Sequence, residues 1–219
     1  MEDILELIKS RRNTKEFLPK FVDWDKISKI VDAGRHAPSC GNLQNWKFIV
    51  VINNDKKQEL ADAALQQYDL INAGALIVIC AEPEKAERYY GLRGERLYTV
   101  QNCAAAAQNM LLEAHSLGLS SRWIGAFEEE MVKRILKVPE DARPQIIIAI
   151  GYPKFVPEKP PKLPLESVVF FNSWRNRIRD PVKYMQYYSV ITQRKLSAAK
   201  EMLKKPLSVV VEKLKRNKE

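Results

Sequence analysis

A basic stretch near the N-terminus, "SRRNTKEF", carries side chains suited to binding phosphate. It contains Arg11, Arg12, Asn13 and Lys15. Guanidinium groups bind phosphate oxygens through paired N–H donors, and an asparagine amide adds a further donor. Basic residues at the end of a helix also complement the helix dipole, which is an ordinary structural role. By itself, the stretch therefore indicates either a phosphate site or a helix terminus.

A run of small, turn-forming residues, Pro38–Asn42, separates two regular segments in a chain that has only 8 glycines. Small residues let the backbone approach a flat ligand closely, although a plain turn needs the same residue types. Asn42 and Gln44 are two positions apart, and we expect both amides on one side of the next segment, facing the edge of a planar heterocycle. Gly125 is a candidate N–H donor or a turn glycine, and Lys162 is a candidate phosphate ligand or a solvated lysine.

The sequence lacks the motifs of several common enzyme classes and metal sites. The sequence has no G-x-G-x-x-G, no Walker lysine loop and no G-x-S-x-G elbow, so a motif-based phosphate cradle and a serine hydrolase are not indicated. Its two histidines are far apart and its three cysteines form no CxxC pair, so we predict no metal site. We expect Cys80 and Cys103 to be buried free thiols, as in a reducing cytoplasm. No apolar run reaches membrane-helix length and no signal peptide is evident, so a cytoplasmic location is expected.

Apolar periodicity and capping residues predict the elements that must position these side chains. The first predicted helix ends near "SRRN", and the second follows Asp23 as its N-cap, with Ile27, Ile30 and Val31 on one face. Three more helices are predicted: 55–68 with Asp55 as its cap, 97–118 ending at Gly118, and 128–136. The predicted strands are 46–53, 75–81, 120–124 and 144–152. Interleaved helices and strands indicate an α/β or α+β core, without choosing the strand order.

The last part of the chain differs in composition. Residues 153–164 hold five prolines and are expected to run extended over a surface. Charge is balanced over residues 1–174, so the whole net charge of +9 lies in residues 175–219. The tail also carries an apolar stripe from Leu196 to Leu214, interrupted by Pro206. We therefore predict a domain of residues 1–174 and a basic amphipathic extension of residues 175–219.

Taken together, the motifs resemble the FMN-dependent nitroreductase family. The resemblance runs in order over residues 4–174 through "SRRNTKEF", "APSCGNLQNWKFIVV", "AAQNMLLEAHSLGLSSRWIGAF", "VPEDARPQIIIAIGYP" and "KLPLESVVFFNSW". It implies an α+β, three-layer fold with a central mixed, mainly antiparallel sheet flanked by helices. It also implies a homodimer with FMN at the subunit interface, reduced by NADH or NADPH and reoxidised by a nitroaromatic, quinone or related small acceptor in a ping-pong cycle.

The resemblance assigns roles to the candidate residues. Arg11, Arg12 and Asn13 would hold the phosphate and ribityl chain, and Lys15 would lie near N1 and O2 of the ring, where it would stabilise the negative charge of the reduced flavin. Lys162 would complete the phosphate site.

The remaining assignments concern the flavin ring. The N–H of Gly125 would donate towards N5, with Ala126 beside it, so Lys15 and Gly125 are the predicted catalytic residues. The small-residue loop would contact the flavin bound mainly by the other subunit, through Pro38, Ser39, Cys40 and Asn42.

Four positions depart from the family pattern, and they leave the substrate preference open. Asn13 replaces a usual serine, Cys40 a usual serine or alanine, Asn45 a usual proline, and Asn102 an expected aspartate.

Two alternatives to a general nitroreductase remain. One is a specialised member of the family, dehalogenase-like or flavin-processing. The other is a non-catalytic protein that binds nucleic acid or an anionic membrane through its basic tail. The tail lacks interleaved aromatic residues beyond "YMQYYS", so we favour its packing against the dimer.

Overall fold

The computed structural model describes residues 3–177 and residue 197. By its internal contacts the chain divides into two units, residues 1–159 and 160–219, and each is considered by itself. The boundary predicted at residue 174 is one of composition and stays a prediction. The amphipathic stripe predicted from Leu196 to Leu214 lies outside the described residues, apart from Ser197.

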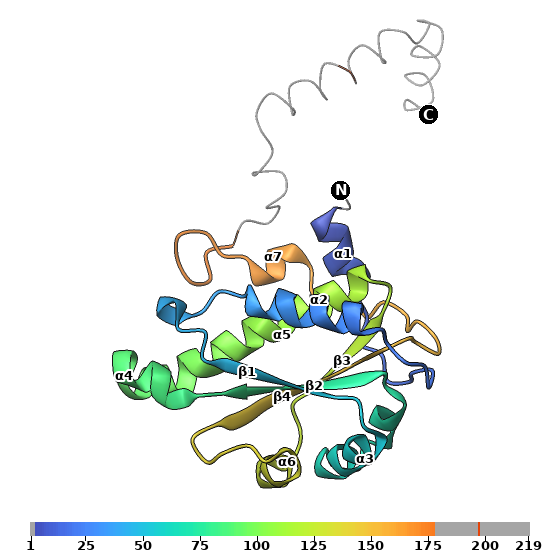
Figure 1. Cartoon of the computed structure of the whole chain (residues 1–219). Helices are drawn as coiled ribbons and strands as arrows, with labels where there is room; N and C mark the ends of the chain where they lie inside the picture. Colours follow the sequence, from blue (N-terminus) through green and yellow to red (C-terminus); the bar gives the residue numbers. More distant parts are fainter. Residues whose placement is uncertain (1–2, 178–196, 198–219) are drawn as a thin grey trace, which may run out of the picture. The chain divides into compact units, whose positions relative to one another are not determined.

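The first unit is built on a four-stranded sheet in the order β1-β2-β4-β3 (Figure 1). All three neighbouring pairs of strands are antiparallel. An isolated parallel bridge joins Asn13 to Ser121 at the β3 edge, so the pairing is mixed but mainly antiparallel, as predicted. The strands are β1 (Trp46–Val51), β2 (Ala75–Ala81), β3 (Ser120–Ile124) and β4 (Arg143–Gly151).

Helices cover both faces of this sheet. The helices that cover it are α2 (Trp24–Arg35) and α5 (Thr99–Ser116) on one face and α3 (Asn54–Ala63) and α6 (Glu129–Leu136) on the other (Figure 1). Successive residues of a strand point to opposite faces. On β2, Ile77 and Ile79 accordingly belong to the core under α2 and α5, and Leu76 and Val78 to the core over α3 and α6. The three-layer α+β fold is confirmed.

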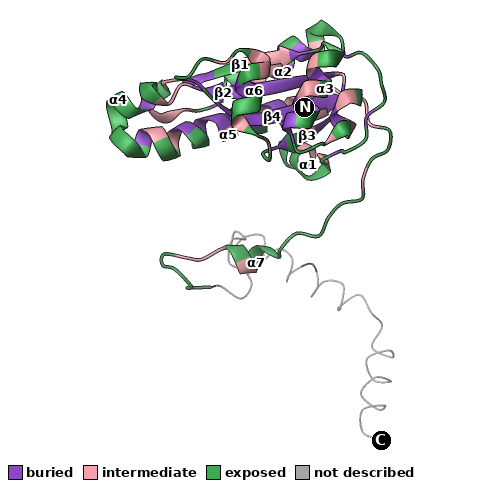
Figure 2. Cartoon of the chain, turned by 90° about the horizontal axis from the view of Figure 1, so that it is seen from below, coloured by how far each residue is buried: buried purple, intermediate pink, exposed green. Residues whose placement is uncertain are grey.

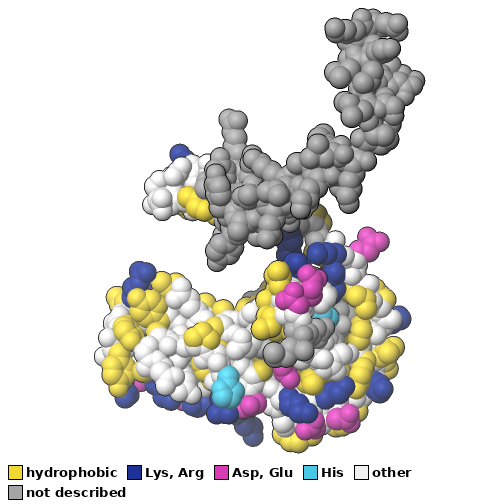
Figure 3. All heavy atoms as spheres, turned by 90° about the horizontal axis from the view of Figure 1, so that it is seen from above, with side chains coloured by type: hydrophobic (Ala, Val, Ile, Leu, Met, Phe, Trp, Pro, Cys, Tyr) yellow, Lys and Arg dark blue, Asp and Glu magenta, His cyan; other side chains and the backbone are white. Residues whose placement is uncertain are grey.

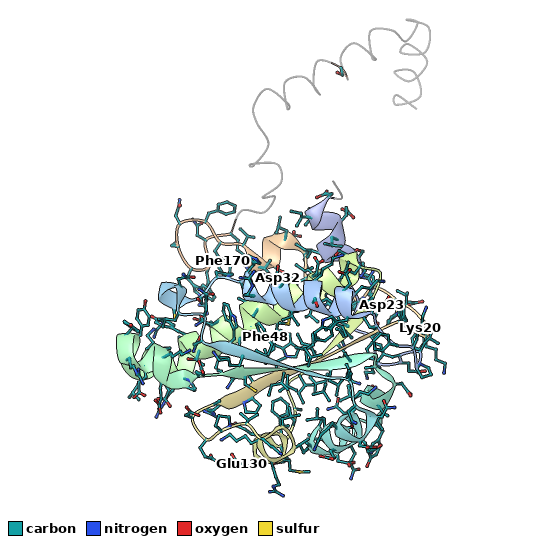
Figure 4. All side chains as sticks on the ribbon, in the orientation of Figure 1. Lys20, Asp23, Asp32, Phe48, Glu130 and Phe170 are labelled. Atoms are coloured by element: carbon teal, nitrogen blue, oxygen red, sulfur yellow. The ribbon has the colours of Figure 1, made fainter. Side chains whose placement is uncertain are left out.

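Each face of the sheet packs against a core of buried hydrophobic residues. Every residue of β2 is buried, as its continuous apolar run predicts (Figure 2). Figure 4 shows Asp23 at the start of α2 and Glu130 on α6, at opposite faces of the sheet. Since both faces are covered, the polar chemistry of this unit is confined to the edges of the sheet and to the segments that lead into and out of its strands.

The remaining elements are further helices and helical turns. They are α1 (Ile4–Ser10), α4 (Pro83–Arg93), the π-helical turn η3 (Gly94–Tyr98) and the 3-10 turns η1 (Cys40–Asn42) and η2 (Tyr68–Asn72), with α7 (Leu165–Val168) in the second unit. Sequence analysis omitted α4 and η3. Only Ala86 of α4 is buried, so this helix shows little of the apolar periodicity by which helices are recognised.

The predicted helices and strands are all present, but one helix was capped and ended wrongly. The N-cap of α3 is Asn53, whose side chain accepts from the N–H of Lys56 at 2.9 Å, so Asp55 lies inside the first turn. The helix ends at Ala63 and not at residue 68. Leu65 and Gln66 have φ angles of 58° and 62°, which are incompatible with a continuing right-handed helix.

The other capping predictions are borne out in position. Asp23 is the N-cap residue of α2, although its side chain makes no capping hydrogen bond. Gly118 follows α5 with a φ of 73°, the conformation that favours glycine after a helix. Residues 153–164 contain no helix or strand, as their prolines predict, apart from a single bridge between Pro153 and Phe17. Among the described residues, no helix is long and apolar enough to cross a membrane.

The corrected cap of α3 can be tested by a pair of substitutions. Asn53→Ala removes the side-chain acceptor of the first turn and should lower the free energy of unfolding by about 1 kcal/mol. Asp55→Ala removes only a first-turn charge and should cost less, about 0.3–1 kcal/mol at low salt. Urea unfolding of both variants gives the comparison. A larger loss in the Asp55 variant would show that the capping assignment is wrong.

Candidate functional site

The basic stretch after α1 is attached to the outer edge of β3. Asn13 and Ser121 form the parallel bridge, and the N–H of Thr14 donates to the carbonyl of Ser121 at 3.1 Å. The N–H of Trp123 donates to Oδ1 of Asn13 at 3.3 Å. Thr14 is fully buried while Asn13 and Lys15 on either side of it are exposed, so these two flank a buried anchor.

Arg12 has the structural role expected of a basic residue at a helix terminus. Its Nη1 donates to the carbonyl oxygens of Lys9, Ser10 and Arg11 at 2.8, 2.8 and 2.9 Å. The last carbonyls of a helix have no partner within the helix, so this guanidinium closes the end of α1. The helix-terminus role is therefore real for Arg12.

Arg11 is different. Its side chain is half-buried, and no hydrogen bond or ion pair of its guanidinium is found within the described residues. Burial lowers the pKa of Arg11, and the positive charge of neighbouring Arg12 lowers it further. A partly buried cation beside a second cation is stabilised by an anion, since a negative charge offsets both effects.

Buried polar atoms without partners gather at the same place. Four buried side-chain N or O atoms lack a hydrogen-bond partner among the described residues, and three of them lie here: Nε of Arg12, Oγ1 of Thr14 and Oγ of Ser121. The fourth, Oε2 of Glu82, forms ion pairs with Lys47 and Lys85 instead. Such atoms are uncommon in folded proteins and call for an explanation, often a bound molecule. Their gathering around the Asn13–Ser121 bridge makes this edge of the sheet a candidate ligand site.

The residues after β3 lie beside a polar cluster that sequence analysis missed. Gly125 and Ala126 are exposed and directly follow the strand. Nε2 of Gln67 is 3.4 Å from the carbonyl oxygen of Ala126. Arg122 on β3 forms an ion pair with Asp69 and a hydrogen bond with Gln67, and its side chain is largely buried. These partners are more than fifty positions apart, so no local sequence pattern announces them.

The loop Pro38–Asn42 is a tight turn and not an extended segment. Gly41, Asn42 and Gln44 have φ angles of 52°, 56° and 48°. The expectation that Asn42 and Gln44 lie on an extended segment is therefore wrong. The two amides do lie together, since Nε2 of Gln44 donates to Oδ1 of Asn42 at 3.2 Å, and their position facing a ligand stays a prediction. A Cβ at Gly41 would come within 2.5 Å of the Tyr90 hydroxyl of α4, so this position needs glycine for space as well as for φ.

The loop and the basic stretch are at opposite edges of the sheet. The loop leads into β1, whereas Asn13 is bridged to the outer edge of β3, and about 14 Å separates the outer strands of a four-stranded sheet. Helix α5 gives a second measure. Asn102 near its start bonds to Cys40 of the loop, and the imidazole Nε2 of His115 near its end lies 2.8 Å from Oγ of Ser10. Thirteen residues of helix span about 20 Å, so one chain does not bring the two groups together.

The last candidate, Lys162, belongs to the second unit, and its place in the phosphate site stays a prediction. A cavity of about 410 Å³ in the first unit lies elsewhere, and none of the predicted flavin residues line it. A site shared by two subunits is not a closed hollow in one chain, so we give more weight to the unpaired polar groups at β3. No cluster of metal-ligating side chains occurs among the described residues.

Comparisons with known proteins bear on the site at this point. Residues 8–73 and 65–152 match the model of the Nitroreductase family. The chain belongs to the nitroreductase family. It is 35% identical over 158 residues to an Archaeoglobus fulgidus protein whose name couples NADH dehydrogenase with NAD(P)H nitroreductase, covering 70% of this chain and 87% of that one.

Two further relatives are named for their flavin. The Bacillus subtilis protein named FMN reductase (NADPH) is 26% identical over 187 residues, covering 80% of this chain and 75% of that one. The structure of the FMN-dependent nitroreductase of Clostridium difficile superposes with a TM-score of 0.68 at 28% identity, covering 78% of this chain and 99% of that one. The family and fold indicated by the motifs are confirmed.

The loop cysteine should differ in reactivity from the other two. Burial raises the pKa of Cys80 to about 11 and that of Cys103 to about 12, so both thiols stay protonated near neutral pH. The thiolate is the reactive form, and only Cys40 is partly exposed. We expect iodoacetamide at pH 8 to alkylate Cys40 alone in the native protein, as read by peptide mass spectrometry. In denaturant all three should react, and equal labelling in the native protein would contradict the burial described here.

Proposed function

We propose that this member of the nitroreductase family binds FMN and uses it to carry electrons from NADH or NADPH to a small acceptor, a nitroaromatic, a quinone or a related compound. The observation that carries the proposal is the gathering of an unpaired, half-buried guanidinium and three unsatisfied buried polar atoms at one edge of the sheet. The names of the relatives, which include an FMN reductase and an FMN-dependent nitroreductase, agree with it.

The residues at the β3 edge fit a flavin mononucleotide. Arg11 supplies an uncompensated positive charge for the phosphate, and Asn13 adds an amide beside it. Arg12 fastens the end of α1 through its Nη1 and so supports Arg11, and its unpaired Nε is proposed to help hold the phosphate and ribityl chain. Lys162 of the second unit is proposed as a further phosphate ligand.

The chemistry at the ring depends on charge and hydrogen bonding. FMN, when bound, supplies a ring that accepts and releases a hydride. We propose that the Lys15 ammonium lies near N1 and O2 of the ring and offsets the negative charge that develops there on reduction. The exposed N–H of Gly125 is the proposed donor towards N5, with Ala126 beside it. No protein nucleophile or metal is required for these steps.

We further propose that the site is shared in a homodimer. The two groups of residues needed for FMN, at β1 and at β3, are separated within one chain. A second copy supplies the missing half, so that Pro38, Ser39, Cys40 and Asn42 of one subunit face the flavin held by Arg11 and Asn13 of the other. The nature of the acceptor, the preference between NADH and NADPH, the cytoplasmic location and the role of the basic tail stay predictions.

The primary test is whether the protein binds FMN. The purified protein should show flavin absorbance, release FMN on denaturation, and lose that absorbance when NADH or NADPH is added without oxygen. Arg11→Ala should weaken FMN binding by about 2–4 kcal/mol, because it removes a charged partner of the phosphate. Arg134→Ala, an exposed arginine on α6, is the matched control and should bind FMN normally. Failure of the wild-type protein to take up FMN contradicts the proposed function.

Sharing of the site can be tested by mixing two defective chains. Arg11→Ala damages the phosphate side, and Gly41→Val displaces the loop through its φ of 52° and its contact with Tyr90. Each homodimer should lose FMN. A heterodimer of the two chains has one site with both defects and one with neither, so it should regain half of the wild-type FMN content. Heterodimers purified through two different tags and lacking FMN would show that the site is not shared.

A further inference from the structure

Asn102 of α5 holds the loop through both ends of its amide. Oδ1 accepts from the N–H of Cys40 at 3.0 Å, and Nδ2 donates to Oδ1 of Asn45 at 2.8 Å. Nδ2 also lies 3.3 Å from Sγ of Cys40. The side chain is almost completely buried, with Asn102 only 4% exposed. A buried amide with both ends bonded is strongly oriented, because turning it over would break every one of these contacts.

Asn45 continues the network towards α4 and η3. Its Nδ2 donates to the carbonyl of Glu82 and to Oγ1 of Thr99, both at 3.1 Å. The Thr99 hydroxyl in turn donates to the carbonyl of Gly94 at 3.0 Å. The N–H of Glu82 donates to the carbonyl of Asn45 at 2.8 Å. Asn45 is fully buried.

The orientation of both amides is fixed by partners that have only one option. The N–H of Cys40 only donates, so it must face the oxygen of Asn102. The carbonyl of Glu82 only accepts, so it must face the nitrogen of Asn45. These two constraints leave the nitrogen of Asn102 opposite the oxygen of Asn45, which is the observed pairing. The network is therefore complementary throughout, with no amide free to turn.

The loop depends on this network for its place. Its own hydrogen bonds are local, such as those from the N–H of Asn42 to the carbonyl of Ser39 and from the N–H of Gln44 to Oγ of Ser39. Local bonds define the shape of a turn but do not attach it to the protein. The bonds between Cys40 and Asn102 attach the loop to α5, and through Asn45 to α4 and η3.

The same network places the arm beside the loop. The arm consists of α4 and η3, residues 83–98, whose end lies at the left of Figures 1 and 3. Tyr89 and Leu92 on it are mostly exposed. Asn45 bonds to the residue before α4 and, through Thr99, to the first residue of η3, so the arm is fixed at both its ends.

We propose that Asn102 and Asn45 are positioning residues that hold the loop Pro38–Asn42 in the position from which it binds FMN. This inference rests on the proposed function, since it assigns that loop to the flavin. The two positions are among those at which the sequence departs from the family pattern, and the structure shows that they contact each other. The pair therefore acts as one unit, with each amide supplying what the other needs.

The first test removes the amide without changing its size. Asn102→Leu leaves the N–H of Cys40 and the oxygen of Asn45 without partners, and we expect FMN affinity to fall by about tenfold to a hundredfold. Asn109→Leu is the matched control on the same helix. Nδ2 of Asn109 donates to the carbonyl of Ala33 at 3.1 Å, away from the loop. Both variants should melt at a lower temperature, but only the change at residue 102 should weaken FMN binding by titration.

The second test uses the protonation state of a carboxyl group. In Asn102→Asp, the protonated acid still has one donor and one acceptor and imitates the amide, whereas the carboxylate only accepts and faces the oxygen of Asn45. Burial raises the pKa of a carboxyl group and brings this change into the accessible range. The FMN dissociation constant of the variant, divided by that of the wild type, should therefore be near one at about pH 5 and rise towards about pH 8.

Other titrating groups near residue 102 should not produce this rise of the ratio with pH. The thiol of Cys40 contacts the amide directly, and that of Cys103 follows it on α5 and stays protonated because burial raises its pKa to about 12. The carboxylate of Glu82 is paired with Lys47 at 3.2 Å and with Lys85. The wild type carries all of these groups, and Asn102→Leu should give a ratio that does not vary with pH.

The outcomes separate this inference from the proposed function. Equal FMN affinity of the two leucine variants, or a flat ratio for Asn102→Asp, overturns the positioning role while leaving FMN binding intact. A wild-type protein that binds no FMN overturns the proposed function itself. Weak binding by Asn102→Leu together with the rising ratio supports the proposal.

Discussion

The covering of both faces of the sheet is the constraint on which the rest of this structure depends. The strands β2 and β4 are buried by helices on either side, so they offer no surface to a ligand. Polar groups are left to the two edges and to the segments that enter and leave the strands. The basic stretch at β3 and the tight loop before β1 occupy those positions, one at each edge. Under the proposed function, a ligand that contacts both groups lies between two subunits.

The two edges hold their functional residues by different means. At β3 the chain is attached by backbone bonds, through Asn13, Thr14 and Ser121, and the side chains around them keep unsatisfied polar atoms. At β1 the loop is attached by the side chains of Asn45 and Asn102, whose bonds are complete. Polar atoms without partners, as at β3, can hydrogen-bond to a ligand. A side-chain network whose hydrogen bonds are all made, as at β1, keeps the loop in place instead.

The neighbouring residues Arg11 and Arg12 have different roles. Arg12 closes the end of α1 through three carbonyls, and the guanidinium of Arg11 beside it has no partner in the part of the chain that the structure describes. The first increases the positive potential around the second and also fixes its backbone. A basic pair at a helix terminus thus serves the fold and the proposed phosphate site together, and neither explanation of the stretch excludes the other.

The sequence by itself determined the family, the four strands, most of the helices and the residue types at the site, because apolar periodicity and short motifs are local properties. It placed β2 correctly as a strand buried on both faces, and Gly125 directly after a strand, but not Asn13 beside β3. It could not separate Arg11 from Arg12, find the pairing of Arg122 with Asp69, or see that Asn45 meets Asn102. The last two contacts join residues far apart in the chain, and the difference between the two arginines depends on which side chain reaches the carbonyls at the end of α1. Only the tertiary structure decides these contacts.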